Sequence, residues 1–303
     1  MSNTVLAIVE TERFPLEVTK RAAQIAKLFD CDLEIVLSDP TVGFLRSKFM
    51  VSADSKQIAE NVRQVQKEEL ERLVNAIGEY DLDVQTSIVK DRPACDAIIA
   101  KALECEPLFV VKGTAYRSPA ERAKFTFNDW QLIRKLDYPL WLVKPADLIE
   151  NPVVIAAVDP MHPHDDKGDC TQSIIDLAKS ITEKFGARLL LLHTYERLEE
   201  VNEYAKLEFK PLRVPVAELE KKMREEHRRE LDVLADANNI DAQAVRQLPG
   251  RTREILPSFA RAENASLVIM GAVARTGLKR RIIGSTAEHV LDHVPCDILI
   301  ARG

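Results

Sequence analysis

The sequence is poor in cysteine, and its cysteines do not form a pattern. Over 303 residues there are five, with no C-x-x-C pair among them. An odd number of scattered cysteines is not typical of a disulfide-stabilised secreted domain. Reduced thiols are typical of the cytoplasm, and we expect a cytoplasmic location. The five are Cys31, Cys95, Cys105, Cys170 and Cys296.

Long apolar runs and an excess of positive charge are also lacking. No apolar run approaches the roughly 20 residues that a membrane-spanning helix needs. The first residues, MSNTVLAIVETERF, lack the basic region of a signal peptide, and their apolar stretch is too short. Lys and Arg number 42 against 48 Asp and Glu, giving a net charge of −6. We therefore expect no membrane partner and no general nucleic-acid binding, which requires a basic face.

An internal repeat organises what is present. A helical stripe spaced by four, three and four residues occurs twice, 156 residues apart, and a second set of matches follows at an offset of 158. Each stripe precedes a short apolar run, LEIVL at 33–37 and LLLLH at 189–193, typical of a strand buried on both faces. The stripes are Val18, Ala22, Ile25, Phe29 and Ile174, Ala178, Ile181, Phe185; the later matches pair Asp83, Gln85, Ala102, Val110, Gly113 with Asp241, Gln243, Ala260, Val268, Gly271.

Each copy alternates strands with helices, which predicts an α/β fold of two tandem, doubly wound, five-stranded parallel sheets of the Rossmann-like kind. The domains are expected at 1–146 and 151–303, separated by the proline-containing segment PADLIENP. Charge-rich helices are expected near 55–79 and 216–238. Strands are expected near 4–9, 32–37, 83–89, 108–111, 140–143 and near 153–158, 188–193, 242–247, 267–270, 297–301, with the last strands of the two copies meeting in an intrachain pseudo-dimer.

The stretch VIMGAVARTGLKRRIIGSTAEHVL (268–291) carries the clearest chemistry. Gly271 follows a predicted strand, where ligands settle in open α/β sheets. Gly284, Ser285 and Thr286 open a predicted helix, whose first N–H groups and dipole suit a phosphate. Ser and Thr at a helix start are also ordinary N-caps, and glycine after a strand is also an ordinary turn. The basic residues between them are Arg275, Lys279, Arg280 and Arg281.

This stretch resembles the G-x2-G-x9-G-(S/T) signature of ATP-binding universal stress proteins, here as G-x2-A-x9-G-S with Ala274 at the second glycine. The strings GSTAEHVLDHVPCD and FTFNDWQLIRK resemble the E-type members, which carry two such domains in one chain. The resemblance implies a second domain that binds ATP or a related adenine nucleotide, with or without Mg. The implied contacts are Asp159, Thr194, Met270, Gly271, Ala274, Arg275, Gly284, Ser285 and Thr286; Asp159-Pro160 is equally consistent with a simple turn.

The first copy departs from the signature. At an offset of 158, Tyr116 stands at the second glycine, Thr126 at the third and Phe127 at the serine; the alternative register places Asn128, also not a glycine, at the third glycine position. Bulky side chains obstruct a phosphate cradle, so the first domain is expected to have lost its nucleotide site.

Two histidine sets are weak metal candidates: His162 with His164, beside two aspartates, and His289 with His293, four apart on the last helix. A solvated loop and a favourable helix-end charge explain them as well, and no metal is expected. The sequence has no G-x-S-x-G elbow, no Walker A loop and no SGG-type pyrophosphatase loop, so catalysis is the weaker expectation.

The resemblance therefore predicts a stress-response and signalling protein whose nucleotide state tunes its association with client proteins. Two alternatives stay open: a slow metal-dependent ATPase that uses Arg275 to Arg281, and a nucleotide-free interaction protein that binds another small or lipophilic ligand. Whether chains form a further homodimer is left open too.

Overall fold

The computed structural model describes residues 4–39, 53–89, 93–114, 127–145, 151–161, 169–197, 216–276 and 280–302. Contacts divide the chain into two compact units. Unit 1 comprises Met1–Asp147, Ala272–Ile283 and Asp297–Ile300, and unit 2 comprises Leu148–Gly271, Gly284–Cys296 and Ala301–Gly303. Within the described ranges, none of the helices combines the length and apolarity needed to cross a bilayer.

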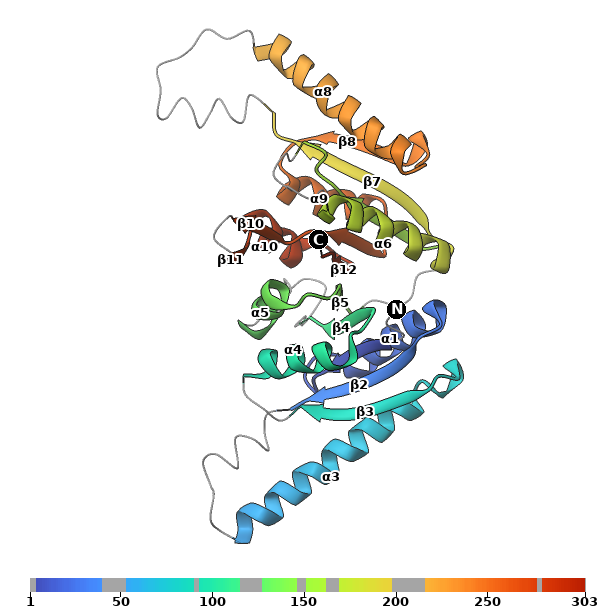
Figure 1. Cartoon of the computed structure of the whole chain (residues 1–303), viewed down its shortest axis with the longest axis vertical. Coiled ribbons are helices and arrows are strands. Elements are labelled where there is room, and N and C mark those ends of the chain that lie inside the picture. The colour runs from blue at the N-terminus through green and yellow to red at the C-terminus, as the bar shows by residue number, and fades with distance from the viewer. Residues whose placement is uncertain are drawn as a thin grey trace. The chain divides into compact units, whose positions relative to one another are not determined.

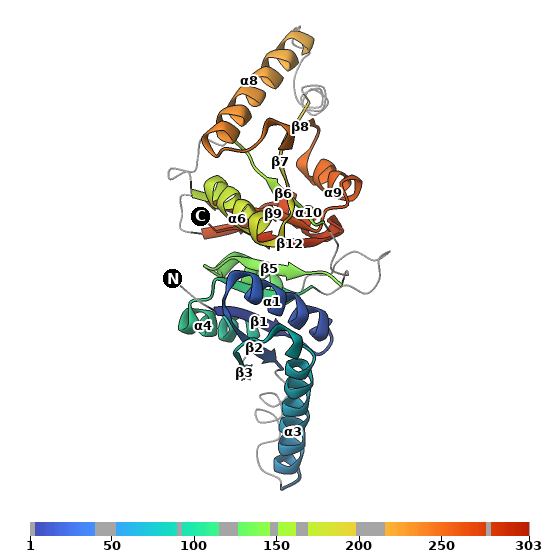
Figure 2. The same cartoon turned by 90° about the vertical axis from the view of Figure 1, so that its right-hand side faces the viewer.

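Unit 1 is built on a parallel sheet in the order β3-β2-β1-β4-β5 (Figure 1). The central strand β1 is fully buried from Val5 to Val9. Helices α1 and α3 lie on one side of the strands and α4 on the other (Figure 2), as right-handed crossovers require. The elements are β1 (Thr4–Val9), α1 (Pro15–Phe29), β2 (Asp32–Ser38), α3 (Ala53–Asn75), the 3-10 turn η1 (Gly78–Tyr80), β3 (Val84–Val89), α4 (Ala94–Cys105), β4 (Phe109–Gly113), α5 (Phe127–Lys135) and β5 (Leu140–Val143).

Unit 2 repeats this plan with parallel strands in the order β9-β6-β7-β8. Helices α6 and α8 lie on one side of the strands and α9 on the other (Figure 2). Its elements are β6 (Val153–Ala157), α6 (Asp169–Phe185), β7 (Arg188–Tyr195), α8 (Val216–Ala237), the 3-10 turn η2 (Ala242–Ala244), β8 (Val245–Pro249), α9 (Thr252–Ala262), β9 (Leu267–Met270) and α10 (Ser285–His293).

The predicted helical stripe is the buried face of α1. Val18, Ala22 and Ile25 are at most 1% exposed. Pro15 fits the first turn because its missing N–H needs no partner there. At the other end Asp30 adopts the left-handed conformation, and its N–H bonds to the carbonyls of Ala26 and Lys27. Spacing and end signals therefore act together to define this helix.

The predicted fold class, α/β with doubly wound parallel sheets, is confirmed, but three local predictions were wrong. Residues 242–244 form η2 rather than strand, because the Asp241 carboxylate accepts the Gln243 N–H at 2.7 Å and starts a turn. Strand β7 continues to Tyr195, two residues beyond the expected end. The expected loop after Gly271 contains an antiparallel hairpin of β10 (Val273–Thr276) and β11 (Arg280–Ile283), counted in unit 1.

The last strand of the second repeat, β12 (Asp297–Ile300), belongs to unit 1, where it pairs antiparallel with β5. Leu299 stands opposite Trp141. The prediction that the last strands of the two repeats meet is therefore confirmed. The pairing is anchored by Asp297, whose side chain is 1% exposed and which accepts hydrogen bonds from the Arg21 guanidinium and from the Lys144 N–H at 3.0 Å.

Candidate functional site

Each unit has a point where the strand order reverses. In unit 2, β6 lies between β7 and β9, and in unit 1, β1 lies between β2 and β4. The chain leaves the central strand (β6 or β1) and its neighbour (β9 or β4) toward opposite faces of the sheet. This divergence opens a crevice at the carboxyl ends of the two strands. In unit 2, Asp159 follows β6 and Gly271 follows β9. Two of the predicted nucleotide contacts are thus placed at the switch point.

The start of α10 is open. Gly284 is the N-cap, with extended backbone (φ −75°, ψ 147°), and its carbonyl accepts the N–H of Glu288 at 3.1 Å. Among the residues that the structure describes, no atom lies within 4 Å of a Cβ built at Gly284. The first N–H groups of a helix have no acceptor inside it, so an anion is stabilised at this end. The expectation that Gly284, Ser285 and Thr286 open the last helix is confirmed.

Gly271 is held against helix α6. A Cβ at this position would lie 2.9 Å from the Cys170 sulfur. Met270, the last residue of β9, is buried, and its carbonyl accepts the Ala301 N–H at 3.0 Å. The glycine therefore has a packing role in unit 2, in addition to leaving room at the carboxyl end of β9.

Asp159 and Thr194 are placed differently from each other. The Asp159 side chain is 51% exposed, and its Oδ1 accepts the Met161 N–H at 3.1 Å, which forms the turn that the sequence analysis left open as an alternative. Thr194 lies inside β7 rather than after it, and its hydroxyl is 2.5 Å from that of Thr252 at the start of α9. Asp159 thus lies at the crevice, whereas the Thr194 hydroxyl contacts α9.

The sequence analysis missed a pair of histidines beside Asp159, of which one is buried. His193 on β7 is 2% exposed; its Nδ1 lies 3.1 Å from the Val158 carbonyl and 3.9 Å from Oδ1 of Asp159. Its Nε2 lies 2.7 Å from Nδ1 of His227 on α8, and the rings stack with centroids 5.0 Å apart. The only hint in the sequence is the histidine that closes the apolar run LLLLH.

The partners of His193 determine its tautomer. A carbonyl can only accept, so Nδ1 of His193 carries the proton and donates to Val158. Nε2 is then an acceptor, and His227 must donate to it from Nδ1. Burial lowers the pKa of His193 below its ordinary value of 6.5, with the hydrogen bond to Val158 and the charge of Asp159 opposing that shift. A neutral His193 therefore joins α8 to the backbone next to Asp159.

The remaining predicted site residues are not gathered at this crevice by the described contacts. Ala274 and Arg275 lie in β10, which is counted in unit 1. His162 and His164 lie outside the described residues. The rings of His289 and His293 stack at 3.9 Å, and Nδ1 of His293 lies 2.7 Å from the His289 carbonyl. Among the residues that the structure describes, no three His, Cys, Asp or Glu side chains are grouped to hold a metal ion.

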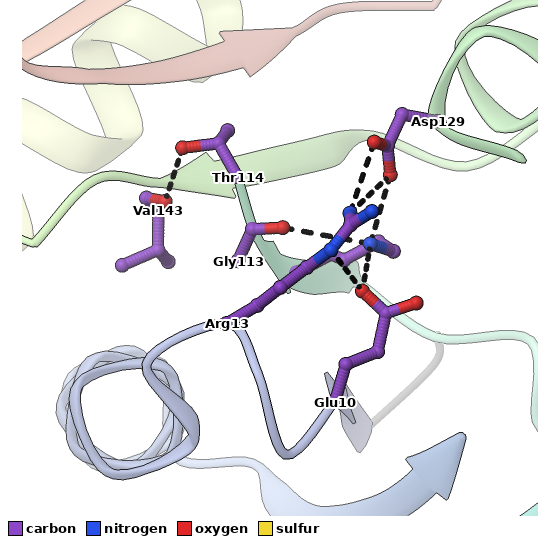
Figure 3. A network of polar contacts seen from close by, with 7 residues as sticks. Glu10, Arg13, Gly113, Thr114, Asp129 and Val143 are labelled. Atoms are coloured by element: carbon purple, nitrogen blue, oxygen red, sulfur yellow. Dashed lines mark hydrogen bonds and ion pairs between the residues drawn. The ribbon is translucent and has the colours of Figure 1, made fainter. Parts of the chain in front are cut away.

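The switch point of unit 1 contains charged side chains instead of space. Lys112 on β4 is 1% exposed, and its Nζ lies 2.7 Å from Oε2 of Glu10 and 2.8 Å from Oδ1 of Asp129. Arg13 contacts both carboxylate oxygens of Asp129 at 2.9 Å and Glu10 at 2.9 Å (Figure 3). A Cβ at Gly113 would lie 2.5 Å from the Arg13 carbonyl oxygen. The loop after β1 is thus packed directly against the end of β4.

Sequence reasoning missed this network as well. It attributed the loss of the first site to Tyr116, Thr126 and Phe127. Tyr116 and Thr126 lie outside the described residues, and the Phe127 side chain is not described either. Helix α5 begins at Phe127 and α10 at Ser285, and both are nine residues long, so the offset of 158 aligns these helices and sets Thr126 rather than Asn128 at the position of the third glycine.

The fold and the crevice define the class of this protein. It consists of tandem, doubly wound α/β units with a switch point of the kind at which α/β proteins bind ligands. Comparison with known proteins gives the family. The model of the Universal stress protein family matches residues 161–302. The Universal stress protein E homolog of Haemophilus influenzae is 24% identical over 265 residues, covering 87% of this chain and 84% of that protein. Universal stress protein E of Escherichia coli K12 is 26% identical over 225 residues, covering 72% of this chain and 68% of that protein.

Solved structures share the fold along the whole chain. A Pseudomonas aeruginosa UCBPP-PA14 protein assigned to the universal stress proteins superposes with a TM-score of 0.73 at 21% identity, covering 99% of this chain and 93% of that one. A universal stress protein from Archaeoglobus fulgidus DSM 4304 gives 0.66 at 15% identity, covering 100% and 99%. Residues 161–302 thus match the Universal stress protein family, and the resemblance of the chain to the E-type members is confirmed.

Proposed function

We propose that this chain binds one adenine nucleotide, ATP or a relative, in its second repeat, and acts in stress signalling through nucleotide-dependent association with client proteins. The observation that carries the proposal is the contrast at the two switch points. In unit 2 the start of α10 is open at Gly284 and Asp159 is half exposed beside β6. In unit 1 the same region is filled by Lys112, Asp129 and their partners.

The proposed contacts have separate roles. The N–H groups at Gly284, Ser285 and Thr286 face the phosphates, where the helix dipole adds favourable potential. Asp159 accepts from the ribose hydroxyls, and the backbone near Thr194 borders the adenine. Arg275 and Ala274 extend the phosphate site, with Mg²⁺ as the counter-ion where triphosphate is bound. The thiol state of the five cysteines fits a cytoplasmic protein, which is the location we propose.

The test measures how many nucleotides each chain binds and whether Gly284→Val abolishes that binding. Calorimetry should give one ATP per chain for the unaltered protein and none for the variant. Because no atom of the described residues lies within 4 Å of the Gly284 Cβ position and the backbone is extended, the free variant should lose no more than about 1 kcal/mol of stability. Gly78→Val in η1, where a Cβ is equally unobstructed, is the matched control and should bind as before.

The outcomes separate the alternatives. At 100 times its dissociation constant, ATP should raise the free energy of unfolding by about 2.7 kcal/mol, a shift that thermal melting detects. Two ATP per chain, or full binding by Gly284→Val, would contradict the placement. Mg²⁺-dependent phosphate release in the same samples would favour the slow ATPase. Absence of ATP binding would favour the alternative of a nucleotide-free interaction protein. Ala274→Gly would then be the first substitution to test, because Ala274 stands where the signature has a glycine.

A further inference from the structure

Four charged residues that the structure describes at the unit 1 switch point form one network. Two cations, Arg13 and Lys112, contact two carboxylates, Glu10 and Asp129, at distances between 2.7 and 2.9 Å. Lys112 and Asp129 are 1% and 2% exposed, and the Arg13 side chain is 12% exposed. At this depth each charge is costly unless it is paired. The network therefore depends on the presence of all its members.

Strand registers identify the equivalent positions in unit 2. Val5 stands opposite Phe109 in unit 1, and Val154 stands opposite Leu267 in unit 2. Counting along these strands equates Glu10 with Asp159, Lys112 with Met270 and Gly113 with Gly271; helices α5 and α10 equate Asp129 with Ala287. Unit 2 therefore has one acidic residue where unit 1 has two, and a buried methionine where unit 1 has a buried lysine.

Asp129 is placed as an anion at a helix start. It is the third residue of α5, in the first turn, where the dipole favours negative charge. The Arg13 guanidinium donates hydrogen bonds to both carboxylate oxygens of Asp129 (Figure 3). The Lys112 ammonium forms an ion pair with one of these oxygens. Paired cations contacting a group at a helix N-terminus are the surroundings that proteins give to phosphate. Here the anion is part of the chain.

We propose that unit 1 contains an anion site that is closed by its own carboxylate: Asp129 occupies it, and Arg13 and Lys112 accept a tetrahedral oxyanion, phosphate or sulfate, once that carboxylate is removed. The site deepens the proposed function by explaining why the first repeat is closed, yet its chemistry does not require that unit 2 bind nucleotide. Ala287 of unit 2 marks the same position without a carboxylate.

The decisive substitutions replace residues of unit 1 with the residues found at the equivalent positions of unit 2. Asp129→Ala copies Ala287 and removes one carboxylate while both cations stay. Lys112→Met copies Met270 and removes one cation. Each is made in a Gly284→Val background, so that phosphate cannot act through the start of α10. Both tryptophans of the chain, Trp130 and Trp141, belong to unit 1, so their fluorescence follows the unfolding of that unit.

Unfolding is followed in chloride and in potassium phosphate at equal ionic strength. The Asp129→Ala protein should unfold earlier than its parent in chloride and recover at least half of that loss in phosphate, and ³¹P line broadening should saturate at one site per chain. The Asp129→Ala/Lys112→Met protein should show no phosphate-specific recovery. The parent with Asp129 intact should respond equally to both salts.

Recovery of equal size in chloride and phosphate, or in the double variant, would overturn the inference, because it would reflect general screening. Stability of Asp129→Ala equal to that of the parent in chloride would overturn it too. If Asp129→Ala does not fold, Asp129→Asn, which keeps the shape and removes the charge, is tested for phosphate-dependent refolding; refolding that is independent of phosphate contradicts the closed site. These results test the closed anion site even if the unaltered chain does not bind ATP, because none of them depends on nucleotide binding in unit 2.

Discussion

The indole of Trp141 on β5 donates a hydrogen bond to Oδ2 of Asp297 on β12, 2.9 Å away. This bond crosses 156 positions of sequence and is buried. The Asp297 carboxylate also accepts hydrogen bonds from the Arg21 guanidinium and from the Lys144 N–H. All of these named partners lie in unit 1. A single carboxylate thereby connects α1, β5 and the last strand of the second repeat.

Asp297→Ala should destabilise unit 1 by about 3–5 kcal/mol, because it leaves the largely buried Arg21 without this carboxylate. Urea unfolding followed by tryptophan fluorescence measures the loss. The exposed Arg228–Asp232 pair on α8 supplies the control, since Asp232→Ala should change stability by no more than about 0.5 kcal/mol. A loss for Asp297→Ala as small as that of the control would show that the carboxylate does not anchor the strand.

The two equivalent glycines should respond unequally to a methyl group. In Gly113→Ala the new Cβ lies 2.5 Å from a backbone oxygen of Arg13, which cannot rotate away, and we expect a loss of about 2–3 kcal/mol in the fluorescence-detected transition. In Gly271→Ala the nearest atom is the Cys170 sulfur at 2.9 Å, the end of a side chain that can move, and the loss should be about 1 kcal/mol or less. Equal losses would contradict the difference in packing.

Unit 2 should lose stability as the pH falls below about 6.5. The pKa of His193 is lowered by burial in the folded state, so the unfolded chain binds a proton near its ordinary pKa that the folded chain refuses. The free energy of unfolding should therefore decrease by up to about 1.4 kcal/mol per pH unit from this group. Urea unfolding by circular dichroism at pH 7.5, 6.5 and 5.5 tests the slope. His193→Gln should flatten it, and an unchanged slope would exclude His193 as its source.

Chelation should leave the melting temperature unchanged. No group of three or more candidate ligands occurs in the described part of the chain, and His293 already bonds the His289 carbonyl. Melting with EDTA, and with zinc added back, is the measurement. A large drop that zinc reverses would implicate His162 and His164, or His289 and His293, in a metal site that stabilises the fold.

Local patterns gave the fold because they depend on residues close in sequence. The stripe of Val18, Ala22 and Ile25 predicts the helix and its buried face without any knowledge of the sheet. The alternation of strands and helices predicted a strand end at Gly271 and a helix start at Gly284, whereas Asp159 was predicted only from the resemblance to the family. The start of β8 was misplaced because the Asp241 carboxylate caps a turn over residues 242–244.

The charged network and the histidine pair could not be predicted in the same way. Arg13 and Asp129 are 116 positions apart, and His193 and His227 are 34 apart. No periodicity relates such pairs, because their contact is created only when strands and helices assemble. The loss of the first-repeat site stays a prediction; the bulky loop residues that suggested it lie outside the described residues or have undescribed side chains, and the structure shows ion pairs at this switch point.

The membership of β12 in unit 1 has a consequence for how the chain is made. Residues up to Asp147 leave the ribosome long before Asp297–Ile300, and at about 5–20 residues per second the delay is roughly 8–30 s. During that interval the LWLV edge of β5 lacks its antiparallel neighbour. An apolar strand edge left open for seconds can pair with another nascent chain on the same messenger. The first unit to be synthesised is therefore completed only after most of the second unit has been made.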